Sequence, residues 1–225
     1  MTSTTPTIDP PARTGALEPS RDCPLCPRLA EFREVQRAAH PGWFNAPVPA
    51  FGDPDAWLAI VGLAPGLQGA NRTGRPFTGD FAGVLLYETL IKFGLAEGEF
   101  LARPDDGLRL TGAIIINAVR CVPPQNKPTP LEIKTCREYL TPNIEALPNL
   151  KVVVALGAIA HQSTVKALGG RLPKARFGHL AEHVMPSGMT LIDSYHCSRY
   201  NQNTRVLTTE MFEAVFERAQ AFRPA

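Results

Sequence analysis

Four short stretches of the chain are almost continuously apolar, and the longer segments between them carry apolar residues at helical spacing. Strands that are apolar on both faces are typical of a parallel sheet covered by helices on either side, because an exposed face would alternate with polar residues. The sequence therefore predicts an α/β fold, a three-layer α/β/α sandwich with a central four-stranded parallel sheet. The predicted strands are 57–61, 112–117, 151–156 and 190–194.

Capping residues mark the predicted helices. Asp80 and Thr208 are of the types preferred at an N-cap. Thr129 and Glu132 form a capping box with Pro130 at the first helical position. The predicted helices are 23–39, 80–94, 129–147, 158–168 and 207–222.

The N-terminal segment has a different character. Residues 1–22 are rich in Thr, Pro and Ser without an apolar period, which predicts a disordered tail. The helix that follows is expected to turn Leu29, Phe32 and Val35 to one side. A length of 225 residues fits a single domain over 23–225.

Composition excludes little. The hydrophobic content of 44% allows a sizeable core, and a net charge of +2 neither supports nor excludes nucleic acid. No apolar run approaches the roughly 18 residues of a membrane span. No basic segment followed by an apolar one directs secretion. We therefore expect a cytoplasmic protein without a membrane partner.

Four cysteines suggest a metal centre. Cys23 and Cys26 form a CxxC near the start, whereas Cys121 and Cys136 come much later. In a reducing compartment such a set is typical of metal binding rather than of disulfides. Spacing alone leaves structural zinc and an iron–sulfur cluster open. Cys197 is a fifth cysteine, most simply a free thiol.

The carboxyl ends of the predicted strands should carry the chemistry, since ligands of open parallel sheets bind there. Four polar or glycine-rich connections begin at those ends, and loops on a rigid sheet often carry function. They are 62–80, 117–128, 157–158 and 194–205.

The first of these loops is rich in glycine, including Gly62 and Gly66, but matches neither GxGxxG nor GxxxxGK[ST]. Glycine content alone also fits a flexible turn. The loop further contains Arg72, Arg75 and Phe77, and an aromatic beside cations can stack a base while the cations hold a backbone. Phe77 taken alone also fits a core residue.

The second and fourth loops add polar candidates. Asn117 stands at a strand end, where its amide suits the hydrogen-bonding edge of a base, or simply a turn. His196 lies just past a strand and is either structural or chemical. Tyr200 is a candidate wedge and Arg199 a candidate phosphate contact, with Ser198 beside them; an ordinary solvated loop is the alternative.

These segments together resemble the uracil-DNA glycosylase superfamily, most closely its iron–sulfur branch and within it the family 5 (type B) enzymes. The resemblance covers about residues 23–216. It is carried by GLAPGLQGANRTGRPFTGD, NAVRCVPPQNKPTP and YHCSRYNQNTRVLT, with CPLCPRL and Cys136 for the metal site. It implies the α/β/α sandwich, a DNA partner and a structural [4Fe–4S] cluster on Cys23, Cys26, Cys121 and Cys136.

The resemblance also implies a mechanism, in which a monomeric enzyme flips uracil out of DNA and hydrolyses the N-glycosidic bond to leave an abasic site. Phe77 would stack on the base and Asn117 would read its polar edge. His196 would donate a hydrogen bond to the leaving pyrimidine. Backbone amides of the turn containing Gly62, Ala64 and Gly66 would add to the stabilisation of charge.

The sequence departs from the family pattern at three places, one of which is Asn203-Thr204-Arg205-Val206, where a Thr-Gly-Arg or similar run is common. Leu63 and Ala64 occupy the turn where related families carry a carboxylate or asparagine that orients the water. Asp80 and Asn71 are then the nearest polar candidates. The less polar wall predicts activity on other deaminated bases, hypoxanthine and xanthine. Cys197 stands where proline is usual.

Two other functions fit parts of the sequence. The missing carboxylate is compatible with a metal-stabilised DNA-damage binding protein without efficient cleavage. A small iron–sulfur electron carrier would leave Phe77, Asn117 and His196 without a role.

Overall fold

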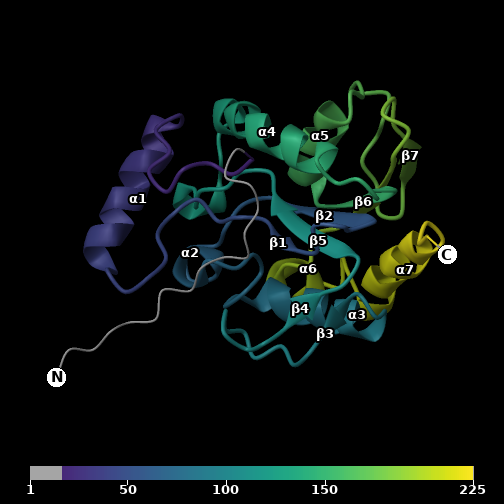
Figure 1. Ribbon diagram of the computed structural model, residues 1–225, viewed down its shortest axis with the longest axis horizontal. Coiled ribbons are helices and arrows are strands. Elements are labelled where there is room, and N and C mark those ends of the chain that lie inside the picture. The colour runs from purple at the N-terminus through teal and green to yellow at the C-terminus, as the bar shows by residue number, and fades with distance from the viewer. Residues whose placement is uncertain (1–16, 225) are drawn as a thin grey trace.

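The computed structural model describes residues 17–224 and has a six-stranded sheet at its centre (Figure 1). The strand order is β1-β5-β2-β6-β8-β7, in which the four inner strands are parallel and the two edge strands antiparallel. The predicted parallel core is confirmed, but the sheet has six strands rather than four. The strands of this sheet are β1 (Phe51–Gly52), β2 (Leu58–Gly62), β5 (Ala113–Asn117), β6 (Val152–Leu156), β7 (Glu182–Val184) and β8 (Thr190–Ser194).

The added strands are too short to show a pattern. β1 has two residues and β7 three, and β7 is partly solvent-exposed. A separate two-stranded sheet, β3 (Ala96–Glu97) with β4 (Arg109–Leu110), lies beside α3 (Phe81–Lys92). Segments of two or three residues carry no detectable alternation, which is why they were missed.

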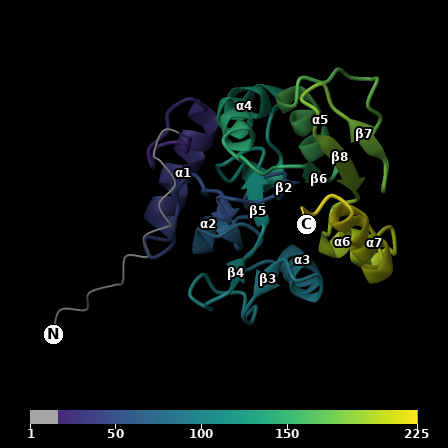
Figure 2. The ribbon, with the colours of Figure 1, turned by 45° about the vertical axis from the view of Figure 1, so that its right-hand side comes forward.

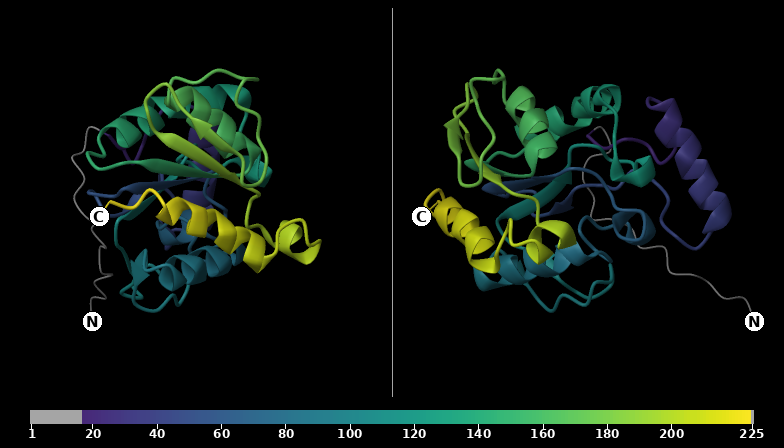
Figure 3. Two further views of the ribbon diagram at one scale, coloured as in Figure 1. Left: turned by 90° about the vertical axis from the view of Figure 1, so that its right-hand side faces the viewer. Right: turned by 180° about the vertical axis from the view of Figure 1, so that it is seen from behind.

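Helices cover both faces of the sheet, as the edge-on views in Figure 3 show. Successive residues of each inner strand face opposite sides, so Ile60 and Ile115 join one core and Val61 and Ile116 the other. Helices α3 and α7 pack on the first core, and α4 and α5 on the second. The helices are α1 (Pro27–Ala39), α2 (Ala70–Thr73), α3 (Phe81–Lys92), the 3₁₀ turn η1 (Pro124–Asn126), α4 (Pro130–Glu145), α5 (Ala158–Ala167), α6 (Arg199–Asn203) and α7 (Thr209–Gln220).

The predicted caps are confirmed. The side chain of Asp80 accepts from the amide of Gly83 at the start of α3. The capping box of Thr129 and Glu132 is present at the start of α4. Thr208 caps α7. These signals were readable because a cap is a local interaction between residues three apart.

The orientation of α1 differs from the prediction. Its buried face consists of Leu29, Arg33 and Gln36, while Val35 is 55% exposed. The inward face is therefore partly polar, and apolar periodicity alone could not identify it. Figures 1 and 2 place α1 at one end of the molecule, near α2 and α4, with α7 at the other end.

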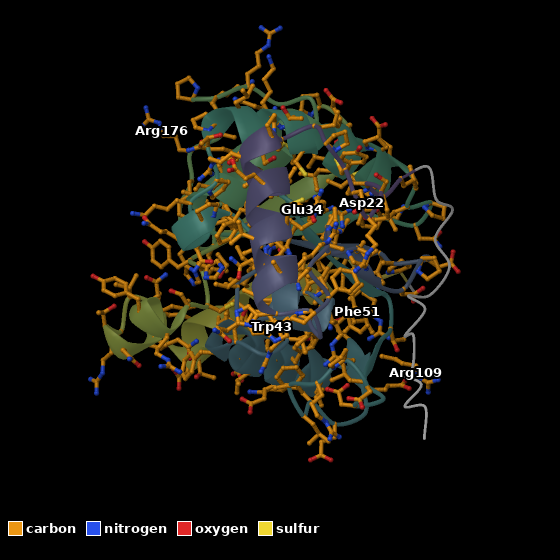
Figure 4. All side chains as sticks on the ribbon, turned by 90° about the vertical axis from the view of Figure 1, so that its left-hand side faces the viewer. Asp22, Glu34, Trp43, Phe51, Arg109 and Arg176 are labelled. Atoms are coloured by element: carbon orange, nitrogen blue, oxygen red, sulfur yellow. The ribbon has the colours of Figure 1, made fainter. Side chains whose placement is uncertain are left out.

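The outer side of α1 carries ion pairs. Arg37 contacts Asp22 at 2.6 Å and Glu34 at 2.7 Å. Figure 4 looks onto this side of the helix, with both acids labelled. The two acidic partners are largely exposed, so these pairs contribute little stability, on the order of 0–1 kcal/mol each.

The predicted tail is shorter than expected within the described residues. Glu18 accepts from the backbone amide of Ala50 at 3.1 Å and pairs with the buried Arg120 at 3.1 Å. The backbone oxygen of Leu17 accepts from Asn143. Residues 17–22 thus belong to the folded part, and the prediction for 1–16 lies outside the described residues. Among residues 17–224, no helix combines the length and the apolar character needed to cross a membrane.

The first turn of α3 passes very close to the loop before it. A Cβ built on Gly83 would overlap the backbone oxygen of Phe77. Phe77 itself has a φ of 53°, in the left-handed region that disfavours side-chain-bearing residues. The glycine therefore lets the loop approach and keeps Phe77 in an unusual conformation.

We predict that Gly83→Ala lowers the melting temperature. In a helix this change ordinarily stabilises by roughly 1 kcal/mol. Here the overlap with Phe77 should instead cost about 1–3 kcal/mol, or about 2–4 °C per kcal/mol for a chain of this size. Gly42→Ala is the control, because a Cβ there meets nothing within 4 Å. Thermal unfolding that leaves both variants equal to wild type would contradict the predicted overlap.

Candidate active site

The ends of the parallel strands bring the predicted segments to one edge of the sheet. β2 and β5 pair in a register that sets Gly62 opposite Asn117, and β6 and β8 pair Leu156 with Ser194. The pairing of the first two strands continues past their ends, since the amide of Ala118 donates to the oxygen of Gly62 at 2.9 Å. Segments distant in sequence thus form one wall.

Gly62, Asn117 and Phe77 meet at one point on this wall. A Cβ on Gly62 would lie 2.5 Å from Asn117 Oδ1 and 2.8 Å from the Phe77 ring. Asn117 is 3% exposed, and its Oδ1 has no hydrogen-bond partner among the described residues. A buried polar atom without a partner costs roughly 1–3 kcal/mol, so its presence at a strand end points to a ligand.

His196 faces the same point from the fourth loop. Its ring and that of Phe77 have centroids 6.2 Å apart with an interplanar angle of 29°. Gly157 follows β6 and lies beside His196. A Cβ built on Gly157 would lie 3.4 Å from the His196 Cβ, an ordinary van der Waals distance. The φ of 93° at Gly157 is a left-handed conformation that favours glycine, which accounts for the residue type here.

A hydrogen bond to its backbone oxygen helps to fix the position of His196. Asn201 Nδ2 donates to the His196 oxygen at 2.8 Å, and α6 begins at the next residues, capped by Ser198. His179 accepts from the amide of Tyr195 and donates to the oxygen of Met211 on α7. Burial lowers the pKa of His196 below its ordinary 6.5, so the ring is neutral at neutral pH. Sequence reasoning missed His179, which no motif distinguished.

Asp80 is both a helix cap and a partly buried acid. Its Oδ1 accepts from the Gly83 amide at 3.2 Å, while its Oδ2 faces the Gly66–Gly69 turn, 2.5 Å from an ideal Cβ on Gly69. Burial raises its pKa above the ordinary 3.8, against the effect of the Gly83 and Ala82 amides. An acid of this kind can hold a water molecule and accept its proton.

Asn71, the other predicted candidate for orienting water, is differently placed. It is buried, and its Nδ2 donates to Asn45 Oδ1 at 2.9 Å. The amide is therefore committed to the interior, which leaves Asp80 as the acid nearest the predicted site.

Cys197 follows His196 and is fully buried. Burial, together with the charge of Asp80, raises its pKa. It is a neutral thiol in the core that α3 and α7 share, packed there rather than exposed to solvent.

The predicted DNA-contacting residues divide into two groups. Arg72 and Arg199 are exposed, and Tyr200 is 73% exposed. The Arg199 guanidinium lies 4.8 Å from the ring centroid of Phe81, an exposed aromatic that sequence reasoning missed. This cation–π pair joins α6 to the start of α3 and leaves the Tyr200 ring in solvent.

The residues of the second group, Arg75 and Ser198, make hydrogen bonds within the protein. Arg75 is buried and forms a bidentate pair with Asp106, both distances 2.7 Å, against the rings of Phe51, Tyr87 and Phe100. Its guanidinium is not available to a phosphate, which corrects the expectation for this residue. The Ser198 hydroxyl accepts from the Asn201 amide as the cap of α6.

Four cysteines line one cavity between α1, α4 and the loop after β5. They are Cys23, Cys26, Cys121 and Cys136, and all five cysteines of the chain are free. Burial above all, with repulsion between neighbouring sulfurs, raises the pKa of Cys26, Cys121 and Cys136 to about 11.

Buried cations and amides face these sulfurs. Arg33 Nη1 lies 3.7 Å from Cys121 Sγ, and the Arg120 amide donates to Cys136 Sγ at 3.2 Å. Both arginines are buried. Cys26, Cys121 and Ala64 also pack against Leu29 and Val119 in one small cluster. The cysteine cavity therefore adjoins the turn after β2.

Comparison with known proteins identifies the family. The uracil DNA glycosylase superfamily matches residues 49–220. A type-5 uracil-DNA glycosylase of Thermus thermophilus is 46% identical over 205 residues, 88% of this chain and 92% of that protein. One of Pyrobaculum aerophilum is 38% identical over 204 residues, 89% of this chain and 88% of that protein. A type-4 uracil-DNA glycosylase of Thermotoga maritima is 32% identical over 169 residues, 72% of this chain and 78% of that protein. The chain therefore belongs to the uracil-DNA glycosylase superfamily, in its type-5 branch.

Proposed function

We propose that this protein is a uracil-DNA glycosylase that takes uracil out of the DNA stack and hydrolyses its N-glycosidic bond, leaving an abasic site. The observation that carries the proposal is the meeting of Gly62, Phe77 and the partnerless Oδ1 of Asn117 at the strand ends. A flat base with a polar edge satisfies both surfaces at once, since the ring of Phe77 stacks and the amide of Asn117 hydrogen-bonds.

The amide of Asn117 reads the chemistry left by deamination. Uracil presents a carbonyl oxygen beside a ring N–H, so Nδ2 donates to the oxygen and Oδ1 accepts from the N–H. Cytosine presents an amino group beside a bare ring nitrogen, the reverse order. Binding of cytosine would leave buried polar groups unpaired, and this cost is the strongest form of discrimination available to such a site.

The same edge occurs in hypoxanthine and xanthine, and we extend the proposal to these bases. The turn beside Asn117 carries Leu63 and Ala64, whose side chains add no polar group that a larger base would leave unsatisfied. Their half-buried positions support a smooth, apolar wall. Selectivity would then reside in the edge and not in the size of the base.

His196 stabilises the departing base. Because burial keeps its ring neutral, it donates an N–H hydrogen bond to the pyrimidine O2 as negative charge develops there. A donor placed where charge develops is worth about 3–4 kcal/mol, or a factor of roughly 10²–10³ in rate. The neutral ring also avoids the cost of burying a second cation beside the positively charged sugar.

Asp80 positions the water that captures C1′. Oδ1 accepts from the amide of Gly83, so we assign to the water Oδ2, the oxygen that faces the Gly66–Gly69 turn. Its raised pKa makes it a better base than an exposed carboxylate once ionised. The charge of Asp80 helps to raise the pKa of Cys197, the residue after His196, which supports a role for this acid close to His196.

We propose that the four-cysteine cavity holds a structural [4Fe–4S] cluster. Four cysteine sulfurs line it, the number of thiolate ligands that such a cluster requires. Ligands of one tetrahedral zinc would lie about 3.8 Å apart, given Zn–S bonds of about 2.3 Å. Among residues 17–224, no three cysteine sulfurs lie within 4.8 Å of one another, which favours a larger group. The cluster would supply no chemistry to the reaction and would fix the loop that follows Asn117.

Exposed groups around the site fit a DNA partner. Arg72 and Arg199 would contact phosphates, and Tyr200 would fill the gap left by the flipped base. We propose a monomeric enzyme, since one base pocket suffices for the reaction. A cytoplasmic location would follow from its access to DNA.

Base excision is the direct test of the proposed function. Duplexes carrying one uracil, hypoxanthine or xanthine are incubated with the protein, and abasic sites are measured as alkali-labile breaks. We expect cleavage at all three bases and none at cytosine. His196→Ala should lower the rate by about 10²–10³-fold. His40→Ala, remote in a loop and stacked on Trp43, is the matched control.

The same assay separates cleavage from binding. A DNA-damage binding protein would shift the modified duplex on a gel without making alkali-labile sites. Such a result would remove the enzymatic proposal, and equal rates for wild type and His196→Ala would remove His196 from it.

Asp80→Asn should separate stability from activity. The folded pKa of Asp80 is raised, so its ionisation costs stability as pH rises from 3.8 through that pKa, and the full cost is present at neutral pH. Asparagine caps a helix equally well. We therefore expect an equal or higher melting temperature at neutral pH, a gap that narrows on acidification, and a much slower excision rate. A variant that is destabilised at neutral pH yet fully active would contradict both roles.

Cys136→Ser should remove the cluster. With pKa values of about 11 the apo thiols are protonated at neutral pH, so loading the site must release protons. The variant purified under anaerobic conditions should lack iron and visible absorbance and unfold at lower temperature. Cys197→Ser is the control and should retain iron. Stoichiometric zinc without iron in wild type would overturn the cluster assignment.

A further inference from the structure

A second group of metal-binding side chains lies away from the cysteines, on the face of the sheet covered by α4 and α5. Asp193 comes from β8, His161 from α5 and His183 from β7. Their ligand atoms all lie within 4.8 Å of one another. Three elements that are far apart in sequence thus present two imidazoles and one carboxylate to a common point.

The hydrogen bonds of His161 fix which of its nitrogens faces that point. Nε2 lies 3.2 Å from the backbone oxygen of Ala175, and a carbonyl oxygen only accepts, so Nε2 carries a proton. Nδ1 lies 2.7 Å from Asp193 Oδ1. In a neutral imidazole Nδ1 then has a lone pair that points at the carboxylate. Two electron-rich atoms this close require a positive charge that bridges them, which is a proton at 2.7 Å or a metal ion at a wider separation.

The arrangement of His161 is the one found around bound metals. A histidine ligand generally donates its other ring N–H to a backbone carbonyl or a carboxylate, which fixes the tautomer and the ring orientation. The oxygen of Ala175 has that role here. The ring also packs edge-on to Phe177, with centroids 5.6 Å apart.

Charge balance supports a metal over a neutral pair. The Asp193 side chain is fully buried, and among the described residues its ion-pair partners are His161 and His183, not a lysine or an arginine. Its Oδ2 lies 3.3 Å from His183 Nε2 and receives the Gly178 amide at 3.4 Å. A buried carboxylate without a permanent cation is costly, and a divalent ion offsets that cost.

We propose that His161 Nδ1, His183 Nε2 and the carboxylate of Asp193 bind a divalent transition metal of the Zn²⁺ class. Two imidazoles and a carboxylate suit zinc rather than magnesium or calcium, which prefer all-oxygen sites. Water would complete the coordination from the side of His183, whose side chain is 17% exposed. Bond lengths of about 2.0–2.2 Å require the 2.7 Å pair to open to roughly 3.4 Å. Rotation of the His161 and Asp193 side chains, which lie on α5 and β8, would supply that movement.

The bound metal would stabilise the fold and would take no part in the excision reaction. It would join α5 to the β7–β8 hairpin, and Asp193 lies three residues before His196 in the sequence. Binding only in the folded state stabilises that state in proportion to the logarithm of free zinc. This inference does not depend on the base that the enzyme removes.

Zinc binding to the cluster-loaded protein tests the proposal. The holoprotein is freed of loosely held metal, its iron is counted, and zinc is titrated by calorimetry while the metal content is measured. We expect one zinc per chain in addition to the iron, and a melting temperature that rises with zinc. His183→Gln keeps a hydrogen-bonding group at an edge position but removes the imidazole. It should weaken zinc binding by at least the ~100-fold that a lost supporting partner can cost.

His40→Gln is the matched control and should bind zinc as wild type does. Cobalt provides a readout that separates this site from the cysteines, because thiolate ligands give an intense charge-transfer band and imidazole–carboxylate ligands do not. A thiolate band, zinc binding unchanged in His183→Gln, or no zinc binding in wild type would each overturn the proposal. The last outcome would assign a proton to the space between His161 and Asp193.

Discussion

At Gly62 the backbone of β2 passes so close to its neighbours that a Cβ would lie 2.5 Å from Asn117 Oδ1 and 2.8 Å from the ring of Phe77. The proposed base pocket depends on this approach. The parallel register of β2 and β5 sets Asn117 beside Gly62, and the left-handed backbone of Phe77 turns its ring to the same point. A methyl group at residue 62 would separate the stacking surface from the hydrogen-bonding edge, and the two could no longer hold one base.

The wall that carries Asn117 is held from behind by the cysteine loop. Backbone pairing continues from the end of β5 through Ala118 and Val119 to the turn after β2. Buried Arg120 then ties this loop to Val48 and Glu18. The proposed cluster would add a covalent anchor a few residues from Asn117. The proposed role of the cluster is to hold this loop in place, because a flexible loop would let the side-chain amide of Asn117 lose its orientation.

Three polar groups at the proposed active site are in surroundings that cost stability. The ionised form of Asp80 and the protonated form of His196 are both disfavoured by their surroundings, and Asn117 Oδ1 lacks a partner. Each of these costs stability in the free protein and becomes useful when a base and a water molecule arrive. Stability is recovered elsewhere, in two fully apolar cores on the faces of the sheet.

The sequence by itself determined the layered fold, the four parallel strands, the helix caps and the segments that gather at the strand ends. These follow from local rules: apolar runs, capping residues and the common direction of parallel strands. Only the tertiary structure decided that Arg75 pairs with Asp106 in the interior, that Asn71 binds Asn45, and that α1 buries Arg33. It alone brought His161 and His183 to Asp193. The physical reason is that burial and pairing of a polar side chain depend on residues far away in the chain, whereas a helix or strand depends mainly on its neighbours.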